Sequence, residues 1–334
     1  MILAVDAGGT STRAAVVDAS GRCLGYGTAG GGNPKSAGYD RAVSAVFTAA
    51  ETAVARVPRP VTLSLALVAM AGAGQTMSRR AIAERLTELG LRGEVKIEGD
   101  LLAMFHSGTD QQSGCVLVSG TGCVAARIAD SRLELVSDGA GWLLGDAGSG
   151  YWIGHAVARA VVASLDGRGP DTKLTALMLE SLQLERTGER IHGRPQVLLD
   201  LIEALYRLQP VELARFAPLA FEAGDSVAAG IVESAASAMA ETLGAVRGEE
   251  SEGPVVIGGS VAAAVLGAEP LLGAPLRAVL RDAEVIHVSD GLVGAAVLGL
   301  RRAGIPVDAI VFQRLHESVA RSREEKLKTP AAPA

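Results

Sequence analysis

Residues 2–10 read ILAVDAGGT, a short apolar run that ends at Asp6 and enters a Gly-Gly-Thr turn. A second apolar run follows at 13–18 and a third at 22–26, with a turn at Ser20-Gly21 between them. Apolar runs of this length, separated by turns that contain glycine, predict a meander of three strands. The same order of parts occurs a second time further along the chain.

The second occurrence begins with residues 115–119, CVLVS, which end at Gly120-Thr121-Gly122. The chain continues through apolar runs at 124–128 and 133–136, with a turn at Asp130-Ser131. Strand, Gly/Thr turn, strand, turn and strand therefore follow in the same order in both halves, although few residues are identical. We interpret this as a repeat of architecture.

Helices and strands alternate around the two meanders. Spacing of the apolar residues predicts helices at 39–56, 78–89 and 291–302, a mostly helical stretch from about 149 to 247, and strands at 63–70, 94–97, 255–257 and 284–288. The strand at 63–70 runs into a turn of small residues at 71–74. This alternation implies an α/β protein, and 334 residues suffice for two domains of ordinary size.

The composition narrows the class of partner. A formal net charge of −6 argues against nucleic acid, and aromatic residues, at 3%, are few for base stacking. Cys23, Cys115 and Cys123 form neither a CxxC pair nor an even disulfide framework, which fits a reducing cytoplasm. We see no signal peptide and no run of the roughly 18 apolar residues that a membrane span needs. We therefore expect a cytoplasmic protein with no nucleic-acid or membrane partner.

The two Gly/Thr turns carry the first chemical signal. Backbone N–H groups and hydroxyls in such turns can form nests for phosphate oxygens, and turns from two similar halves can face each other across a cleft. Asp6 would lie close to those phosphates, where a carboxylate serves mainly as a magnesium ligand. The alternative for DAGGT alone is a turn that needs positive φ. Neither GxxxxGK[ST] nor a GxGxxG after the first strand occurs, which excludes the two common nucleotide loops.

Together with IGGS at 257–260, the two turns resemble the phosphate-1, phosphate-2 and adenosine motifs of the actin, Hsp70 and sugar-kinase superfamily. GDLLAMF and DGLVGAAVLG stand where that superfamily has its two connecting helices. The runs AVDAGGTSTR, GGGN, EGDLLAMF, VSGTGC and DGAGWLLGDAGSGYWIG resemble the N-acetylglucosamine kinases related to the vertebrate enzyme. These kinases belong with the ATPases that activate benzoyl-CoA reductases and acyl-CoA dehydratases. The resemblance spans residues 1–300, and its most specific part is 138–154.

The resemblance implies a two-lobed actin-like ATPase fold, with duplicated ribonuclease H-like domains around a cleft. The expected N-terminal lobe comprises residues 1–108 and 290–320, and the expected C-terminal lobe comprises residues 109–289. Residues 321–334, charged and then rich in Pro and Ala, are expected to form a flexible tail. The implied cofactors are ATP and Mg²⁺, the implied substrate is a small sugar, and we expect a homodimer.

Three residues carry the main roles that the resemblance implies. Asp100 corresponds to the family's catalytic base, which takes the proton from the sugar 6-hydroxyl during in-line transfer; the alternative is an N-cap of the next helix. Asn33 matches a sugar-contacting Asn, with a turn residue in GGGNP as the alternative. Asp146 and the segment Gly139–Leu143 match a loop that wraps the sugar, and the two oxygens of Asp146 can bind two vicinal hydroxyls.

The remaining matched positions fall into groups. Further sugar-binding positions are Cys123, Ala140, Gly141 and Trp142, of which Trp142 could instead close the loop or belong to the core. Phosphate-binding positions are Gly8, Gly9, Thr10, Gly120, Thr121 and Gly122, the adenosine loop is Gly259 and Ser260, and the metal position is Asp6. Cys123 and Val124 stand where vertebrate enzymes place polar residues, and Ala147 replaces the acidic residue of GDEGS, so the sugar itself stays open. Arg13 follows the first turn on an alternating strand and is expected to face solvent.

Three functions follow from these motifs. The preferred one is a kinase for N-acetylglucosamine, with glucosamine, N-acetylmuramic acid and N-acetylmannosamine as near neighbours. The second is an ATP-driven activator of a dehydratase, which would hold an iron–sulfur cluster between two subunits; Cys115 within a strand and Cys123 after a turn are poorly placed for that. The third is a sugar sensor without catalysis, which Asp6, Asp100 and both turns disfavour. The repressor-related sugar kinases carry a Cys-rich zinc motif that is absent from this sequence.

Overall fold

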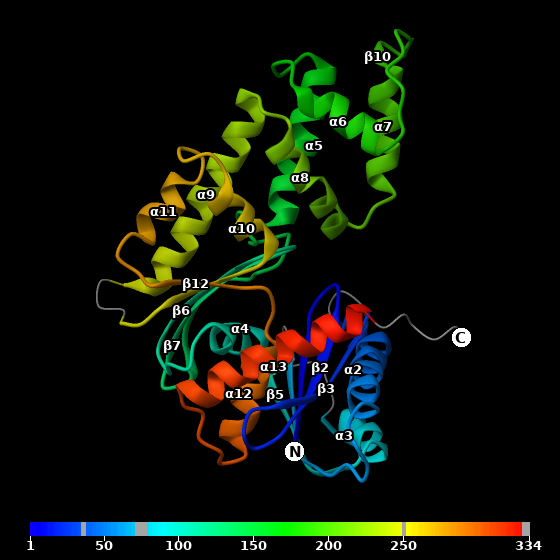
Figure 1. Ribbon diagram of the computed structural model, residues 1–334. Coiled ribbons are helices and arrows are strands. Elements are labelled where there is room, and N and C mark those ends of the chain that lie inside the picture. The colour runs from blue at the N-terminus through cyan, green and yellow to red at the C-terminus, as the bar shows by residue number, and fades with distance from the viewer. Residues whose placement is uncertain (35–37, 71–78, 249–251, 329–334) are drawn as a thin grey trace. The chain divides into compact units, whose positions relative to one another are not determined.

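The structure is a computed structural model that describes residues 1–34, 38–70, 79–248 and 252–328. The chain divides into two compact units, each built around one five-stranded sheet (Figure 1). The first unit comprises Met1–Ser113, Ile128–Arg132 and Val288–Ala334, and the second comprises Gly114–Arg127 and Leu133–His287.

The sheet of the first unit contains the predicted meander and two further strands. Its strands are β1 (Ile2–Ala7), β2 (Thr12–Val17), β3 (Cys23–Ala29), β4 (Leu63–Met70) and β5 (Leu91–Gly99), in the order β3-β2-β1-β4-β5. β1 is the central strand, antiparallel to β2 and parallel to β4. All six of its residues are buried, as in a strand that has both faces covered. The turn predicted at 71–74 lies outside the described residues.

Helices cover both faces of this sheet. On one face, Leu3 and Val5 share a core with residues of α2 (Tyr39–Val54) and α3 (Arg79–Glu88). On the other face, α12 (Leu292–Arg302) packs against β1, and α4 (Asp100–Gly108) packs against α12. The N–H of Gly294 in α12 donates to Ser107 Oγ in α4 at 2.8 Å. The close packing of α12 through small residues was predicted and is confirmed.

A long C-terminal helix, α13 (Ala309–Lys328), replaces part of the predicted tail. Leu315 and Val319 of α13 are fully buried, and Arg323 forms an ion pair with Asp290 at 2.8 Å. The prediction of a flexible tail from residue 321 is therefore wrong up to residue 328, because these contacts hold the helix against the first unit. Residues 329–334 lie outside the described part of the chain.

The first unit also includes residues 109–113, 128–132 and 288–289, which were expected in the second lobe. The N–H of Ser131 donates to the carbonyl of Gln112 at 2.8 Å, and Arg301 Nη1 donates to Ser131 Oγ at 3.2 Å. These bonds attach the tip of a hairpin to α12 and explain why the tip groups with the first unit.

The sheet of the second unit repeats the plan of the first. Its strands are β6 (Gly114–Ser119), β7 (Cys123–Ala129), β8 (Arg132–Asp138), β11 (Val255–Gly258) and β12 (Val285–Val288), in the order β12-β11-β6-β7-β8. β11 pairs parallel with β6, as β4 does with β1. The predicted repeat of architecture is thus confirmed.

The stretch that was predicted to be mostly helical lies between β8 and β11. It contains α5 (Gly150–Asp166), α6 (Lys173–Ser181), the short pair β9 (Arg190–Ile191) and β10 (Arg194–Pro195), α7 (Gln196–Tyr206), the 3-10 helix η1 (Pro210–Phe216), α8 (Ala217–Glu222) and α9 (Ser226–Arg247). After β11 follow α10 (Ser260–Gly267) and α11 (Ala274–Val279). Figure 1 shows these helices on one side of the second sheet, where Leu117 and Ile257 share a core with Ile153 and Met239. Among the helices of the described residues, none has both the length and the apolar composition that crossing a bilayer requires.

Candidate active site

The first Gly/Thr turn joins β1 to β2. The N–H of Gly8 donates to the carbonyl of Ser11 at 3.0 Å, which closes the turn. Gly9 and Thr10 are exposed at its tip. An exposed tip is compatible with the predicted phosphate nest, which stays a prediction.

The GGGN segment lies directly against this turn. The N–H of Gly32 donates to the carbonyl of Gly8 at 2.9 Å. A Cβ atom on Gly31 would lie 2.4 Å from the carbonyl oxygen of Gly9, so only glycine permits this approach. Asn33, half-buried, follows this contact and is held beside the turn. Its place is compatible with the predicted role in sugar binding, which stays a prediction.

Asp6, at the end of β1, is a buried carboxylate that is only 5% exposed. Its Oδ2 accepts from the N–H of Gly291 at 3.1 Å, and Arg13 Nη1 lies 3.7 Å from the same oxygen. Burial, followed by the nearby charge of Asp290, raises the pKa of Asp6 to about 7, although the Gly291 hydrogen bond and Arg13 lower it. Among the described residues, no group of three or more His, Cys, Asp or Glu side chains is arranged to hold a metal ion. The role of Asp6 as a metal ligand therefore stays a prediction.

Sequence reasoning missed a charged network around Asp6. Arg13 Nε lies 3.4 Å from Asp290 Oδ2, and Arg323 Nη2 donates to Asp290 Oδ1 at 2.8 Å. The expectation that Arg13 faces solvent is wrong, because both carboxylates draw its guanidinium inward. Asp290 is the first residue of DGLVGAAVLG, and its place in that motif was the available signal. No signal in the sequence points to Arg323, because it lies in the segment for which a flexible tail is predicted.

Asp100 is the first residue of α4. Gly99, with φ −68° and ψ 140°, occupies the N-cap position, so the alternative in which Asp100 is the N-cap residue does not match the geometry. The carboxylate accepts from the N–H of Leu101 at 3.0 Å and is half-buried. It is close enough to Asp6 to raise the pKa of Asp6. A carboxylate at this strand-to-helix junction can serve as a proton acceptor.

The second Gly/Thr turn joins β6 to β7 and meets the start of α5. The N–H groups of Gly150 and Tyr151 donate to the carbonyls of Gly120 and Thr121 at 2.7 and 3.2 Å. The N–H of Gly120 donates to the carbonyl of Gly122 at 2.9 Å. Thr121 is exposed at the tip, as Thr10 is in the first turn. Each unit thus has one Gly/Thr turn with an exposed Thr at its tip, and the binding of phosphate by these turns stays a prediction.

The predicted adenosine loop lies against this second turn. Gly259 has φ 89°, and a Cβ atom there would lie 2.2 Å from the carbonyl oxygen of Ser119. Only glycine fits this position for both reasons. Ser260 is exposed and begins α10. Gly259 therefore adjoins the turn at Gly120–Gly122, and the role of Gly259 and Ser260 in binding adenosine stays a prediction.

The loop that begins at Asp138 is closed by the side chain of that residue. Its Oδ1 accepts from the N–H of Asp146 at 2.7 Å, and its Oδ2 from the N–H of Ala147 at 2.9 Å. Asp146 Oδ1 in turn accepts from the N–H of Cys123 at 3.1 Å. Asp138 was missed, although it opens the most specific motif of the sequence. It positions Asp146, which stays the predicted sugar ligand.

Three neighbouring predictions for sugar contact have different outcomes. Cys123 is 1% exposed and packs in the core of the second unit, so the prediction of a sugar contact by its thiol is wrong. Burial raises the pKa of this thiol to about 12. Ala140 and Gly141 are accessible within the loop. Trp142 is 40% exposed and packs edge-on against Tyr151, which excludes the core alternative.

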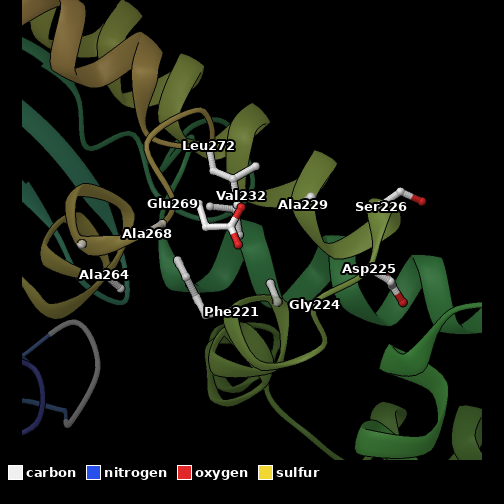
Figure 2. A pocket seen from close by; sticks show the side chains of 12 residues that line it. Phe221, Gly224, Asp225, Ser226, Ala229, Val232, Ala264, Ala268, Glu269 and Leu272 are labelled. Carbon is white, nitrogen blue, oxygen red and sulfur yellow. The ribbon is translucent and has the colours of Figure 1, made fainter.

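A cavity of about 620 Å³ opens beside α10. Figure 2 shows Val232, Glu269 and Leu272 on one wall, with Phe221 nearby. Ala264, one turn along α10 from Ser260, also lines it. The cavity is large enough for a purine ring, and it adjoins the helix that starts at the predicted adenosine loop.

The two repeated sheets define the class of protein, which is the actin-like fold of sugar kinases. A provisionally assigned N-acetylglucosamine kinase from Porphyromonas gingivalis superposes with a TM-score of 0.68 at 20% identity, over 91% of this chain and 100% of that one. A ROK family glucokinase from Streptomyces griseus superposes with a TM-score of 0.53 at 18% identity, over 90% and 99% of the two chains. The predicted fold class is confirmed.

Within this class, the chain belongs to the BadF/BadG/BcrA/BcrD ATPase family, whose model matches residues 3–299. It is 29% identical over 323 residues to an N-acetyl-D-glucosamine kinase of Dictyostelium discoideum, covering 90% of this chain and 98% of that protein. It is 29% identical over 174 residues to an N-acetylmuramic acid/N-acetylglucosamine kinase of Clostridium acetobutylicum, covering 51% and 53%. The family predicted from the motifs is confirmed.

Proposed function

We propose that this protein is an ATP-dependent kinase that converts N-acetylglucosamine to its 6-phosphate. The observation that carries the proposal is the placement of Asp100 at the start of α4, near Asp6 and in the same unit as the first phosphate nest. Two findings support this proposal. The chain belongs to an ATPase family, and it is 29% identical to an N-acetyl-D-glucosamine kinase across 98% of that protein's length.

In the proposed reaction, the oxygen of the sugar 6-hydroxyl forms a bond to the γ-phosphorus of ATP, and Asp100 accepts the proton of this hydroxyl. The bond between this phosphorus and the bridging oxygen of the β-phosphate breaks, and ADP leaves. Thr10 and Thr121, at the tips of the two turns, would hold phosphate oxygens. Asn33 and Asp146 would orient the sugar hydroxyls.

Mg²⁺ would be held by Asp6, directly or through water, and would neutralise charge on the transferred phosphoryl group. Asp6 suits this role because it is a buried carboxylate at the end of β1, next to the first Gly/Thr turn. We further propose a cytoplasmic homodimer. Size-exclusion chromatography with light scattering would test the dimer.

A coupled assay for ADP, with a panel of amino sugars, tests the proposal most directly. We expect turnover with N-acetylglucosamine that requires both ATP and Mg²⁺. Glucosamine, N-acetylmannosamine and N-acetylmuramic acid in the same panel would rank the substrates. Failure with every hexose would refute the kinase, and purification of a brown, iron-containing protein would favour the activator of a dehydratase.

A further inference from the structure

The helix α13 lies outside the part of the chain that the family model matches. That model ends at residue 299, whereas α13 spans Ala309–Lys328. Figure 1 shows α13 lying across the first unit, where it packs against β3 and α12. One of its anchors is at the surface, where Arg314 Nη1 donates to the carbonyl of the exposed Ser20 at 2.7 Å. The family match therefore assigns no role to this helix.

Arg323, further along α13, reaches inward to a buried carboxylate. Its Nη2 donates to Asp290 Oδ1 at 2.8 Å. The side chain of Asp290 is 5% exposed, so water screens this contact poorly. A charge-assisted hydrogen bond of this length is strong and restricts the orientation of the carboxylate. Arg323 therefore fixes Asp290 as well as attaching the helix.

The carboxylate of Asp290 in turn organises the start of α12. Its Oδ1 accepts from the N–H of Leu292 at 3.1 Å, while the N–H of Gly291, between them in the chain, donates to Asp6 Oδ2 at 3.1 Å. A Cβ atom on Gly291 would lie 3.1 Å from Asp6 Oδ1 and 3.3 Å from the Cβ of Ala103 in α4, so the three segments are closely packed. The donor that Gly291 offers to Asp6 thus depends on the position of Asp290.

Arg13 of β2 contacts the same two carboxylates. Its Nε lies 3.4 Å from Asp290 Oδ2, and its Nη1 lies 3.7 Å from Asp6 Oδ2. Basic and acidic side chains therefore alternate in the order Arg323, Asp290, Arg13, Asp6. Without Arg323, Asp290 would keep Arg13 as its cationic partner among the described residues and would draw that guanidinium away from Asp6.

We propose that Arg323 is a positioning residue of the proposed active site, and that α13 acts on this site through it. By holding Asp290, Arg323 sets the two groups that contact Asp6, which are the N–H of Gly291 and the guanidinium of Arg13. The proposal rests on the proposed function, because that function places Asp6 beside the phosphates of ATP. The alternative is that α13 only stabilises the first unit, in which case Arg323 and Arg314 are equivalent anchors.

Isothermal titration calorimetry with the nonhydrolysable ATP analogue adenylyl imidodiphosphate and Mg²⁺ tests this assignment. The proteins are the wild type, Arg323→Gln, Arg323→Lys, Asp290→Asn and the double variant Arg323→Gln/Asp290→Asn. Arg314→Gln is the control, because it removes the surface anchor of the same helix. An ADP assay with N-acetylglucosamine runs in parallel, and thermal unfolding verifies that each protein is folded at the assay temperature.

We expect Arg323→Gln to weaken binding of the analogue and to lower kcat, each by roughly tenfold, with the KM for N-acetylglucosamine changed by no more than about twofold. Arg323→Lys should lose about threefold in each, because its ammonium group keeps the charge without the planar fork of the guanidinium. Arg314→Gln should behave as the wild type. The losses in Arg323→Gln and Asp290→Asn should not add in the double variant, because both act through one carboxylate.

Wild-type values in Arg323→Gln, equal losses in Arg314→Gln, or additive losses in the double variant would overturn the proposal. Should Arg323→Gln be unfolded at the assay temperature, Arg323→Lys carries the test, and wild-type values in that variant would overturn it. A loss of affinity for the analogue that depends on Arg323 and Asp290, without turnover of any sugar, would support the role of α13 and refute the kinase.

Discussion

Asp6 and Asp100 are two carboxylates of one unit with different access to water. Asp6 is 5% exposed and its pKa is raised to about 7, whereas Asp100 is half-buried at a helix start. A proton acceptor must reach the hydroxyl from which it takes the proton. A carboxylate that binds a cation attracts it more strongly where the dielectric constant is low, as in a buried site. The difference in burial therefore matches the two proposed roles.

Replacing Asp100 with Asn keeps the shape of the side chain and removes the proton acceptor. We expect kcat for N-acetylglucosamine to fall by roughly 10² or more, with binding of ATP retained. Steady-state kinetics and calorimetry with ATP would measure both. Glu98→Gln is the matched control, because Glu98 lies two residues earlier and pairs with Arg302. Near-normal kcat in Asp100→Asn would place the base elsewhere.

The raised pKa of Asp6 makes stability depend on pH. The folded pKa is about 7 and the ordinary value 3.8, so between these values the folded state binds more protons than the unfolded state. This contribution is fully present below about pH 4 and is lost as the pH rises to about 7, by at most about 4 kcal/mol. Asp6→Asn should lack this decline when unfolding is measured with urea in the absence of Mg²⁺.

Asp18→Asn is a suitable control for this experiment. Asp18 has a lowered pKa because Ser20 and Arg22 donate hydrogen bonds to it, against the opposing effect of burial. Its contribution to stability is lost only as the pH falls below about 4. Wild type and Asp18→Asn should therefore show the same slope between about pH 5 and 7. A slope in Asp6→Asn equal to that of the wild type would contradict the assignment.

Among the helices, α13 carries Arg323, which belongs to the charged network around Asp6. Arg323 pairs with the buried Asp290 at 2.8 Å, and its side chain is 29% exposed. Arg323→Gln should lower the free energy of unfolding by about 1–3 kcal/mol, because a buried carboxylate loses a charged partner. Lys326→Gln, which removes a contact of the same helix with Thr28, should cost less. If both variants lose the same free energy of unfolding in urea, the loss comes from weaker docking of α13 in general and not from the Arg323–Asp290 ion pair.

The helix α10 offers a separate test of the nucleotide assignment. Ala264 lines the cavity of Figure 2, and Ala263 is its exposed neighbour outside the lining. If the adenine base enters this cavity, Ala264→Trp should raise the KM for ATP by roughly tenfold or more through loss of space. Ala263→Trp should change the KM for ATP by no more than about twofold relative to the wild type. An unchanged KM in Ala264→Trp would place the base elsewhere.

At the scale of the whole molecule, the proposed roles draw on both units. Asp6, Asp100 and Thr10 belong to the first unit, and Thr121 and Asp146 to the second. A sugar and a nonhydrolysable ATP analogue that both bind the same folded state should raise Tm together by more than the sum of their separate shifts, if binding of one favours binding of the other. Scanning calorimetry would measure these shifts. Strictly additive shifts would indicate that the two ligands bind independently.

The two meanders, their repeat and the positions of the two Gly/Thr turns can be predicted from the sequence. These features are local, since apolar runs and Gly/Thr turns are encoded by neighbouring residues. The motifs around Asp100 and Asp146 could be matched for the same reason. Cys123 shows the limit of this approach, because its place after a turn did not reveal that its side chain points into the core of the second unit.

The environment of Asp6, in contrast, depends on contacts between distant parts of the chain. Its carboxylate accepts from the N–H of Gly291, 285 positions away, and Arg323 reaches Asp290 from a helix in the segment where the sequence predicts a tail. Such contacts form when the chain folds back on itself, and no local pattern of residue types specifies them. The nests follow from neighbouring residues, whereas the balance of buried charge beside them depends on which distant side chains the fold brings together.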